Sequence, residues 1–196
     1  MGGPCLIEIT DLRHGVLDIP SLVIPQGLTA VFGRNGAGKT TLLKICSGLL
    51  LSDRGSVKID GLAPRLQNAG YVSEFPDRHL LFGIVYDEIA SSLRFARLPA
   101  DEIDRKVQKI AEEAGISHLL DRECRTLSGG EKMLVGITAA IADDPVLLVL
   151  DEPDSHLDPL TAEEILLFVC SKKIPYVLWS SHSRTLLFRA ETEVRL

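Results

Sequence analysis

The glycine-rich segment GRNGAGKTT at residues 33–41 limits the possible fold more than any other stretch of the chain. It follows the apolar run LTAVFG and precedes KTTLLKICSGLLL, in which apolar residues recur at helical spacing. A strand, a glycine-rich loop and a helix in this order match the pattern G-x-x-x-x-G-K-[ST], whose backbone N–H groups enclose phosphates at a helix N-terminus. The sequence therefore predicts a binding site for a nucleoside triphosphate.

Two residues of this loop have distinct expected roles. Lys39 is expected to reach the β- and γ-phosphates and to take part in catalysis, while the Thr40 hydroxyl is expected to ligate Mg²⁺. A glycine-rich turn with an incidental lysine is the alternative, but the complete pattern between a strand and a helix favours the phosphate site. The residues expected to contact the nucleotide are Gly33, Arg34, Asn35, Gly36, Ala37, Gly38, Lys39, Thr40 and Thr41.

A second chemical signal ends the apolar run DPVLLVLDEP at residues 144–153, which has the length and composition of a strand buried on both faces. Asp151 and Glu152 fall at the carboxyl end of this strand, where parallel sheets bind their ligands. Asp151 is expected to face the Mg²⁺ bound by Thr40, and Glu152 to polarise an attacking water as general base. Without the phosphate loop, a polar turn at the strand end would explain both carboxylates.

The order of the remaining elements defines the fold class. Strands that alternate with helices predict an α/β fold with a mostly parallel sheet, in one domain of 196 residues. The helical run at 84–142 interrupts this alternation and indicates a helical insertion. Further strands are predicted at 5–12, 21–27, 28–33, 55–61, 69–74 and 174–182.

Composition excludes several classes of function. The net charge is −6 and the longest run of Lys or Arg is two residues, which argues against nucleic acid as a partner. The four cysteines form no C-x-x-C pair, which argues against a zinc site and a disulfide framework. No stretch approaches the ~18 apolar residues of a membrane span, and no leader sequence is recognisable. We therefore expect a reduced cytosolic setting, with any membrane role exerted through a partner.

Three further segments follow the phosphate loop in a fixed order: LSGGE at 127–131, DSHLD at 154–158 and WSSH at 179–182. With the loop and LDEP they resemble the signature motif, the D-loop and the switch histidine of ATP-binding-cassette (ABC) ATPases. The resemblance implies a P-loop NTPase with a mostly parallel core sheet, a small antiparallel β-subdomain and a helical subdomain at about 75–142. It implies a single ABC ATPase domain over residues 1–196.

The same resemblance implies that two copies enclose two ATP molecules head to tail. Ser128, Gly129 and Gly130 of one copy would face the γ-phosphate on the phosphate loop of the other, because glycines let a phosphate approach the backbone closely. Taken alone, these three residues are more typical of a helix cap and a hinge. His182 would sense the γ-phosphate, and a structural histidine is the alternative.

The sequence departs from the family pattern at several places, among them Leu134 and Ala139, where many family members carry arginine. Glu74 replaces the usual glutamine, and its carboxylate can still ligate Mg²⁺. Glu131 replaces the last residue of the usual signature, also a glutamine. The segment DLRHGVLDIPSL lacks the aromatic residue that stacks on adenine in the family. His14 is the nearest planar side chain, and Leu17 is a less specific alternative.

The segment FPDRHLLFGIVYDEIASSL at 75–93 resembles energy-coupling-factor and cobalt-type importers, in which it lines a groove for a helix of the membrane subunit. Leu80, Leu81, Phe82 and Ile84 could form that surface, and core packing is the alternative. The implied function is ATP hydrolysis at the cytoplasmic face of a membrane, with ATP and Mg²⁺ as cofactors. The implied partners are a second ABC ATPase subunit, identical or related, and membrane-embedded subunits.

Two other functions remain open. A soluble ABC ATPase not linked to transport is the first, although such proteins usually carry two cassettes or long coiled-coil insertions. A P-loop kinase is the second, and the signature and D-loop argue against it.

Overall fold

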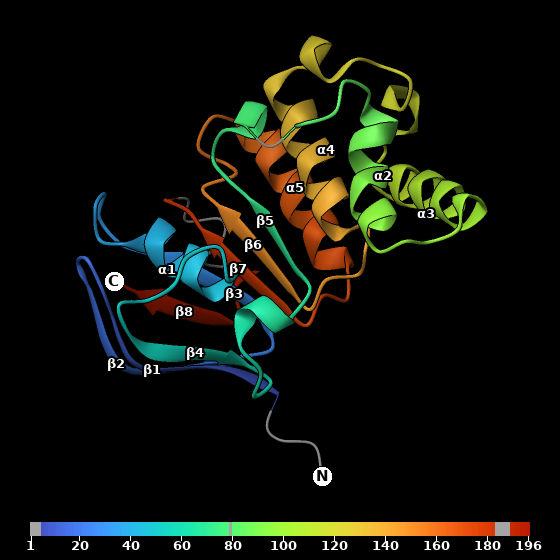
Figure 1. Cartoon of the computed structure of the whole chain (residues 1–196). Helices are drawn as coiled ribbons and strands as arrows, with labels where there is room; N and C mark the ends of the chain where they lie inside the picture. The colour runs from blue at the N-terminus through green and yellow to red at the C-terminus, as the bar shows by residue number, and fades with distance from the viewer. Residues whose placement is uncertain (1–4, 79, 183–188) are drawn as a thin grey trace. The chain divides into compact units, whose positions relative to one another are not determined.

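The computed structural model describes residues 5–78, 80–182 and 189–196 (Figure 1). The chain divides into two compact units. The first comprises Met1–Tyr71, Val146–Glu152 and Ile174–Leu196, and the second comprises Val72–Pro145 and Pro153–Lys173. The helical segment expected at 75–142 falls in the second unit, which also includes the segment after Glu152.

The first unit contains a five-stranded sheet in the order β5-β6-β7-β3-β8 (Figure 1). β3 pairs in parallel with β7 and β8, and β6 pairs in parallel with β7. Every residue of β6 and β7 is buried, as their continuous apolar runs predict. The predicted α/β architecture is confirmed. The strands are β3 (Gly27–Phe32), β5 (Ala69–Val72), β6 (Leu147–Asp151), β7 (Tyr176–Ser180) and β8 (Thr192–Arg195).

A second, three-stranded antiparallel sheet in this unit has the order β2-β1-β4. Its strands are β1 (Leu6–His14), β2 (Leu17–Pro25) and β4 (Arg54–Ile59). β2 begins at Leu17 rather than at 21, because β1 and β2 form a hairpin in which His14 pairs with Leu17. Gly15 has a φ of 56° in the turn of this hairpin.

Helix α1 (Lys39–Cys46) follows the glycine-rich loop and packs its apolar face into the core of the first unit. The sequence predicts a helix as far as residue 51, which is wrong. Ser47 caps the helix and Gly48 follows with a φ of 77°, the left-handed conformation that ends many helices. Leu49 and Leu51 therefore lie outside the helix and are exposed.

The second unit is helical, with helices α2 (Val85–Phe95), α3 (Ala100–Glu113), α4 (Gly129–Ile141) and α5 (Pro159–Ser171). Leu93, Val107 and Val135 belong to one buried cluster that α2, α3 and α4 share. Apolar spacing does not predict α5, whose start is marked by Asp158 and Pro159. The short 3₁₀ turns of the chain are η1 (Pro64–Leu66), η2 (Pro76–Arg78), η3 (Ser117–Leu119) and η4 (Cys124–Thr126).

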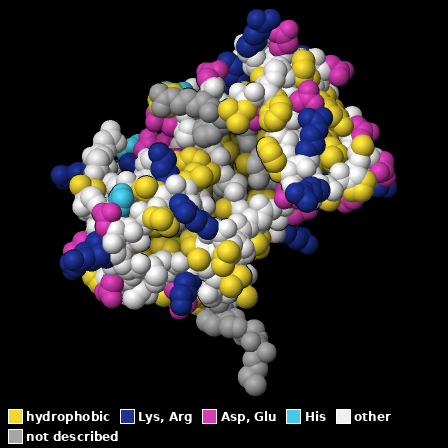
Figure 2. All heavy atoms as spheres, in the orientation of Figure 1, with side chains coloured by type: hydrophobic (Ala, Val, Ile, Leu, Met, Phe, Trp, Pro, Cys, Tyr) yellow, Lys and Arg dark blue, Asp and Glu magenta, His cyan; other side chains and the backbone are white. Residues whose placement is uncertain are grey.

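The surface carries charges of both signs. Figure 2 shows Lys and Arg side chains spread among Asp and Glu side chains on the visible face. Among the described residues, none of the helices has the length and apolar content required to cross a membrane.

Candidate functional site

The glycine-rich loop connects β3 to α1 through two glycines with positive φ, Gly36 at 82° and Gly38 at 102°. Gly38 caps α1 in the left-handed conformation, and a Cβ atom there would lie 2.6 Å from Leu17 Cδ2. Gly38 is therefore required both by its backbone angle and by space. Around Gly36 no atom lies within 4 Å of such a Cβ, so the backbone is open to a ligand. The first turn of a helix adds N–H groups that have no intrahelical partner, which makes this loop suited to phosphate.

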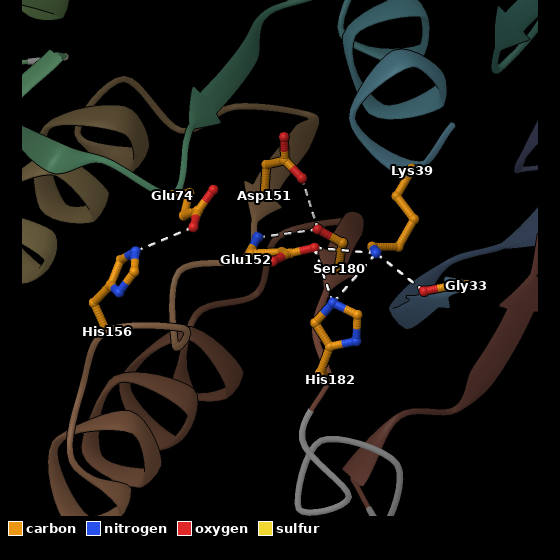
Figure 3. A network of polar contacts seen from close by, with 8 residues as sticks. All are labelled: Gly33, Lys39, Glu74, Asp151, Glu152, His156, Ser180 and His182. Carbon is orange, nitrogen blue, oxygen red and sulfur yellow. Dashed lines mark hydrogen bonds and ion pairs between the residues drawn. The ribbon is translucent and has the colours of Figure 1, made fainter. Parts of the chain in front are cut away.

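The three residues predicted to be catalytic meet in the first unit (Figure 3). Lys39 is only 5% exposed, and its Nζ donates to the Gly33 carbonyl at 3.1 Å. The same Nζ lies 3.1 Å from Glu152 Oε1 and 3.4 Å from His182 Nε2. His182 Nε2 lies in turn 3.3 Å from Glu152 Oε1. A buried cation, a carboxylate and an imidazole thus converge from α1 and from the ends of β6 and β7.

Asp151 is buried, and both of its carboxylate oxygens accept hydrogen bonds from hydroxyl groups. Ser180 Oγ donates to Oδ1 at 2.8 Å, and the Tyr71 hydroxyl donates to Oδ2 at 3.1 Å. Burial and the neighbouring Asp151 charge raise the pKa of Tyr71 well above its usual value, so its hydroxyl remains a donor. Tyr71 belongs to β5 and Ser180 to β7, the two strands beside β6. No motif contains Tyr71, and the segment WSSH contains Ser180 but gives an expected role only to His182.

Glu152 has a φ of 51°, a conformation that L-residues seldom adopt outside special turns. Its N–H donates both to the Ser180 carbonyl at 3.1 Å and to Ser180 Oγ at 3.0 Å. In an extended strand, successive side chains point to opposite faces. The left-handed turn breaks this alternation at Glu152, whose side chain lies against Lys39.

Two of the three predicted metal ligands belong to the first unit. Asp151 offers a carboxylate at the end of β6, and Thr40 offers an exposed hydroxyl in the first turn of α1. Both are oxygen donors of the kind that Mg²⁺ prefers. No group of three or more His, Cys, Asp or Glu in the described part of the chain could hold a metal. Mg²⁺ usually binds through one or two carboxylates together with water and phosphate oxygens, so the donors Asp151 and Thr40 are of a kind that fits this ion.

Glu74 and His156 form a separate pair in the second unit. Glu74 Oε1 lies 3.1 Å from His156 Nε2 (Figure 3). The Phe75 ring lies against the same imidazole, with 5.4 Å between the ring centroids. The predicted third metal ligand therefore has a partner from the D-loop segment.

The signature segment begins helix α4. Ser128 Oγ accepts from the Glu131 N–H at 3.3 Å, and Glu131 Oε2 accepts from the Ser128 N–H at 2.7 Å, forming a capping box. Gly129 and Gly130 lie in the first turn of the helix, which contradicts a hinge at this position. A Cβ at Gly129 would have no neighbour within 4 Å. Ser128 and Gly129 are exposed, so this helix N-terminus is open to a ligand.

The residues considered for adenine contact lie at the turn of the β1–β2 hairpin. His14 Nδ1 lies 3.3 Å from Asp53 Oδ1. Leu17 is 4% exposed and packs against Gly38, so the alternative that assigned it to adenine is wrong. Val16 is 71% exposed, and its Cγ2 lies 3.3 Å from the Cβ position of Gly38. Val16 lies at the tip of the β1–β2 hairpin, a position that a search for aromatic residues does not consider.

Comparison with known proteins agrees with this geometry. Residues 17–155 match the family described as ABC transporter. The chain belongs to the ABC transporter family. Membership of this family implies nucleotide binding, and it confirms the resemblance carried by the phosphate loop and the signature.

The relatives of this ABC protein include several import proteins. The molybdate/tungstate import ATP-binding protein WtpC of Pyrococcus horikoshii is 41% identical over 143 residues, which cover 69% of this chain and 41% of WtpC. The energy-coupling factor transporter ATP-binding protein EcfA1 of Mycoplasma mobile is 36% identical over 156 residues, covering 74% of this chain and 56% of EcfA1. The chain thus spans about half the length of these relatives.

A solved structure matches nearly the whole chain. It is cbiO1 from Clostridium perfringens, described as part of the ABC transporter complex cbiONQ. It has a TM-score of 0.88 and 25% sequence identity, and the match covers 98% of this chain and 85% of cbiO1. The ABC ATPase fold and the resemblance to energy-coupling-factor and cobalt-type proteins are confirmed.

Proposed function

We propose that this chain is the ATP-binding and ATP-hydrolysing subunit of an ABC transporter of the energy-coupling-factor type. It acts at the cytoplasmic face of a membrane through separate membrane-embedded subunits. The observation that carries the proposal is the convergence of Lys39, Glu152 and His182 beside the phosphate loop. Relatives named as import and transporter ATP-binding proteins support the coupling to transport.

Lys39 and Glu152 have different roles in hydrolysis: Lys39 binds phosphate, and Glu152 is the general base. When ATP binds, the Lys39 ammonium group contacts the phosphate oxygens instead of the Glu152 carboxylate. Glu152 is then no longer paired with Lys39 and can accept a proton. Glu152 then accepts a proton from water as the water oxygen bonds to the γ-phosphorus and the bond to the β-phosphate oxygen breaks. His182 lies 3.3 Å from Glu152 and orients the γ-phosphate beside it.

The oxygen donors Thr40 and Asp151 would hold Mg²⁺, with Glu74 as a proposed third ligand. When bound, Mg²⁺ would neutralise charge on the β- and γ-phosphates. The loop amides of residues 33–41 bind the phosphates.

A second ABC ATPase subunit, identical or related, completes the site. Ser128, Gly129 and Gly130 of that subunit face the γ-phosphate, and the open backbone of Gly129 and the N-terminus of α4 support this role. ATP binding closes the dimer and hydrolysis reopens it.

The membrane subunit docks on the second unit. A cavity of about 410 Å³ there is lined by three residues of the predicted groove, Leu80, Phe82 and Ile84, and by the charged residues Asp77, Glu123 and Arg125. The buried carboxylate of Glu88 accepts the Phe82 N–H at 2.7 Å and so holds the loop that forms one wall. These contacts favour a groove for a helix of the membrane subunit over simple core packing.

Two experiments test the proposal. Glu152→Gln removes the base and should trap an ATP-dependent dimer, measured by light scattering with ATP and Mg²⁺. A protein that stays monomeric would contradict the ATP-sandwich dimer.

Affinity purification from native membranes should recover a membrane protein with the chain. An abundant soluble complex without one would favour the soluble ABC ATPase instead, and phosphoryl transfer to an acceptor other than water would favour a kinase.

A further inference from the structure

We infer that Ser180 and Tyr71 are positioning residues that set the geometry of Asp151 and Glu152 from the two strands beside β6. The inference rests on the proposed function, because it assigns these residues to the same nucleotide site. It goes beyond the roles given to the motifs, because Tyr71 lies outside every motif and Ser180 lies in WSSH, where only His182 has an expected role.

The Ser180 hydroxyl connects the two acidic residues to each other. It is fully buried, donates to Asp151 Oδ1 at 2.8 Å and accepts from the Glu152 N–H at 3.0 Å. A hydroxyl has one proton, and an N–H group can only donate. The Glu152 N–H therefore occupies an acceptor position of Ser180, and the hydroxyl proton is directed to Asp151. A single side chain fixes the carboxylate of one residue and the backbone of the next.

The backbone at Glu152 depends on this contact. Its φ of 51° is a strained conformation that persists only where surrounding contacts hold it. Ser180 supplies two acceptors for the Glu152 N–H, its carbonyl and its hydroxyl. Loss of the hydroxyl leaves the carbonyl alone to hold the turn. The Glu152 carboxylate, 3.1 Å from Lys39, would then lose its fixed position.

Tyr71 fixes the second oxygen of Asp151 from the opposite strand. Its hydroxyl donates to Oδ2 at 3.1 Å, while Ser180 holds Oδ1, so the plane of the carboxylate is set from both sides. Each carboxylate oxygen has two lone pairs. One lone pair on each oxygen of Asp151 therefore stays available to a cation. Tyr71 contacts Asp151 alone, whereas Ser180 contacts both acidic residues. Removal of the Tyr71 hydroxyl should therefore affect Mg²⁺ binding only, and removal of the Ser180 hydroxyl should affect both Mg²⁺ binding and kcat.

The test compares Ser180→Ala, Ser180→Thr and Tyr71→Phe. Ser180→Ala should raise the Mg²⁺ concentration for half-maximal ATPase activity and lower kcat, each by about 10–100-fold, the usual cost of losing a group that orients a metal ligand. Tyr71→Phe should raise the Mg²⁺ requirement with a much smaller change in kcat. Ser180→Thr restores the hydroxyl and should recover most of both losses. Mn²⁺ binding with a non-hydrolysable ATP analogue, followed by electron paramagnetic resonance, should weaken in parallel without any turnover.

Two matched controls separate positioning from packing. Thr29→Val removes another buried hydroxyl of the same sheet, whose Oγ1 has no hydrogen-bond partner among the described residues. Tyr176→Phe removes a buried tyrosine hydroxyl that donates to Asp60 at 2.5 Å. Both controls should leave the Mn²⁺ affinity and the Mg²⁺ requirement unchanged.

The outcomes distinguish this inference from the proposed function. An inactive wild-type protein would contradict the proposed function. An active wild-type protein whose Ser180→Ala and Tyr71→Phe variants keep its Mg²⁺ requirement and Mn²⁺ affinity would overturn the inference alone. If Ser180→Ala lowers the melting temperature too far for kinetics, Tyr71→Phe is compared with Tyr176→Phe instead. A Tyr71→Phe variant with unchanged Mg²⁺ requirement and Mn²⁺ affinity would then overturn the inference.

Discussion

The ammonium group of Lys39 lies 3.1 Å from Oε1 of Glu152, and the lysine is almost completely buried. The phosphate-binding cation and the proposed general base therefore hold each other in place. Lys39→Ala should lower ATP affinity by at least about tenfold, because a hydrogen bond to a charged group contributes about 1.5–3 kcal/mol, and should abolish hydrolysis. Titration with a fluorescent ATP analogue and a phosphate-release assay measure both effects. Lys44→Ala, in the same helix, is the control, and unchanged ATP affinity in Lys39→Ala would refute the assignment.

The Glu74–His156 pair should contribute little to stability. Its side chains are 35% and 60% exposed, and surface pairs of this kind contribute about 0–1 kcal/mol. Glu74→Gln and His156→Ala should therefore change Tm by no more than about 4 °C. Glu74→Gln should nevertheless alter the Mg²⁺ dependence of ATPase activity. If the rate and the Mg²⁺ dependence both match the wild type, Glu74 is not a metal ligand.

The two glycines of the signature should respond differently to alanine. Gly129→Ala places a methyl group where no atom lies within 4 Å, so Tm should be unchanged or higher. The methyl group should still block the phosphate of the facing subunit, and ATP-dependent dimerisation should fail. Gly130→Ala brings a Cβ to 2.9 Å from Thr161 Cγ2 and should lower Tm. Calorimetry and light scattering measure these effects; normal dimerisation of Gly129→Ala would exclude a close phosphate contact.

The capping box predicts a dependence of stability on pH. Hydrogen bonds from Ser128 lower the pKa of Glu131 below its ordinary value of 4.5. A lowered pKa means that the stabilisation is present above 4.5 and is lost as pH falls through the folded-state pKa. Wild type should exceed Glu131→Gln in stability by up to about 0.5 kcal/mol at neutral pH, with the difference vanishing in acid. Urea unfolding at several pH values measures it. Glu112→Gln, at an exposed site, is the control, and a difference independent of pH would contradict the prediction.

Val16 should contact the base of ATP. Its exposed side chain lies beside Gly38, and an aromatic residue there should stack on adenine, which contributes about 1–3 kcal/mol per base. Val16→Trp should therefore raise ATP affinity, and Val16→Asp should lower it several-fold. Affinity for inorganic triphosphate should not change in Val16→Trp, which is the internal control. His14→Ala tests the sequence-based expectation, and an unchanged ATP affinity would remove His14 from the site.

The strands and the phosphate loop could be predicted because their signals are local. β6 and β7 are buried along their whole length and therefore appear as continuous apolar runs. The ends of helices were harder to predict. Leucines continue after Gly48, although its left-handed backbone has already ended α1. α5 lacks a single apolar face, because Leu160 and Leu167 are exposed while Leu166 is buried.

The candidate site was predictable only where its residues belong to motifs. The proximity of Lys39, Glu152 and His182 follows from the family pattern and the carboxyl ends of parallel strands. The contacts of Tyr71 and Ser180 with Asp151 follow from the strand order β5-β6-β7, which brings together residues far apart in the sequence. The difference in exposure between Val16 and Leu17 follows from the hairpin, because Val16 lies in its turn whereas Leu17 is the first, buried residue of β2.

The position of β3 between β7 and β8 affects how the protein folds during its synthesis on the ribosome. Val31 pairs with Ser180 and with Val194, so this strand has no neighbour in its sheet until residue 176 and those after it have been synthesised. Contacts between such distant residues slow folding, and an unpaired apolar strand is prone to aggregate. The phosphate loop follows β3 directly. Ribosome-bound chains that end before β7 should therefore fail to bind ATP, although they already contain every residue of that loop.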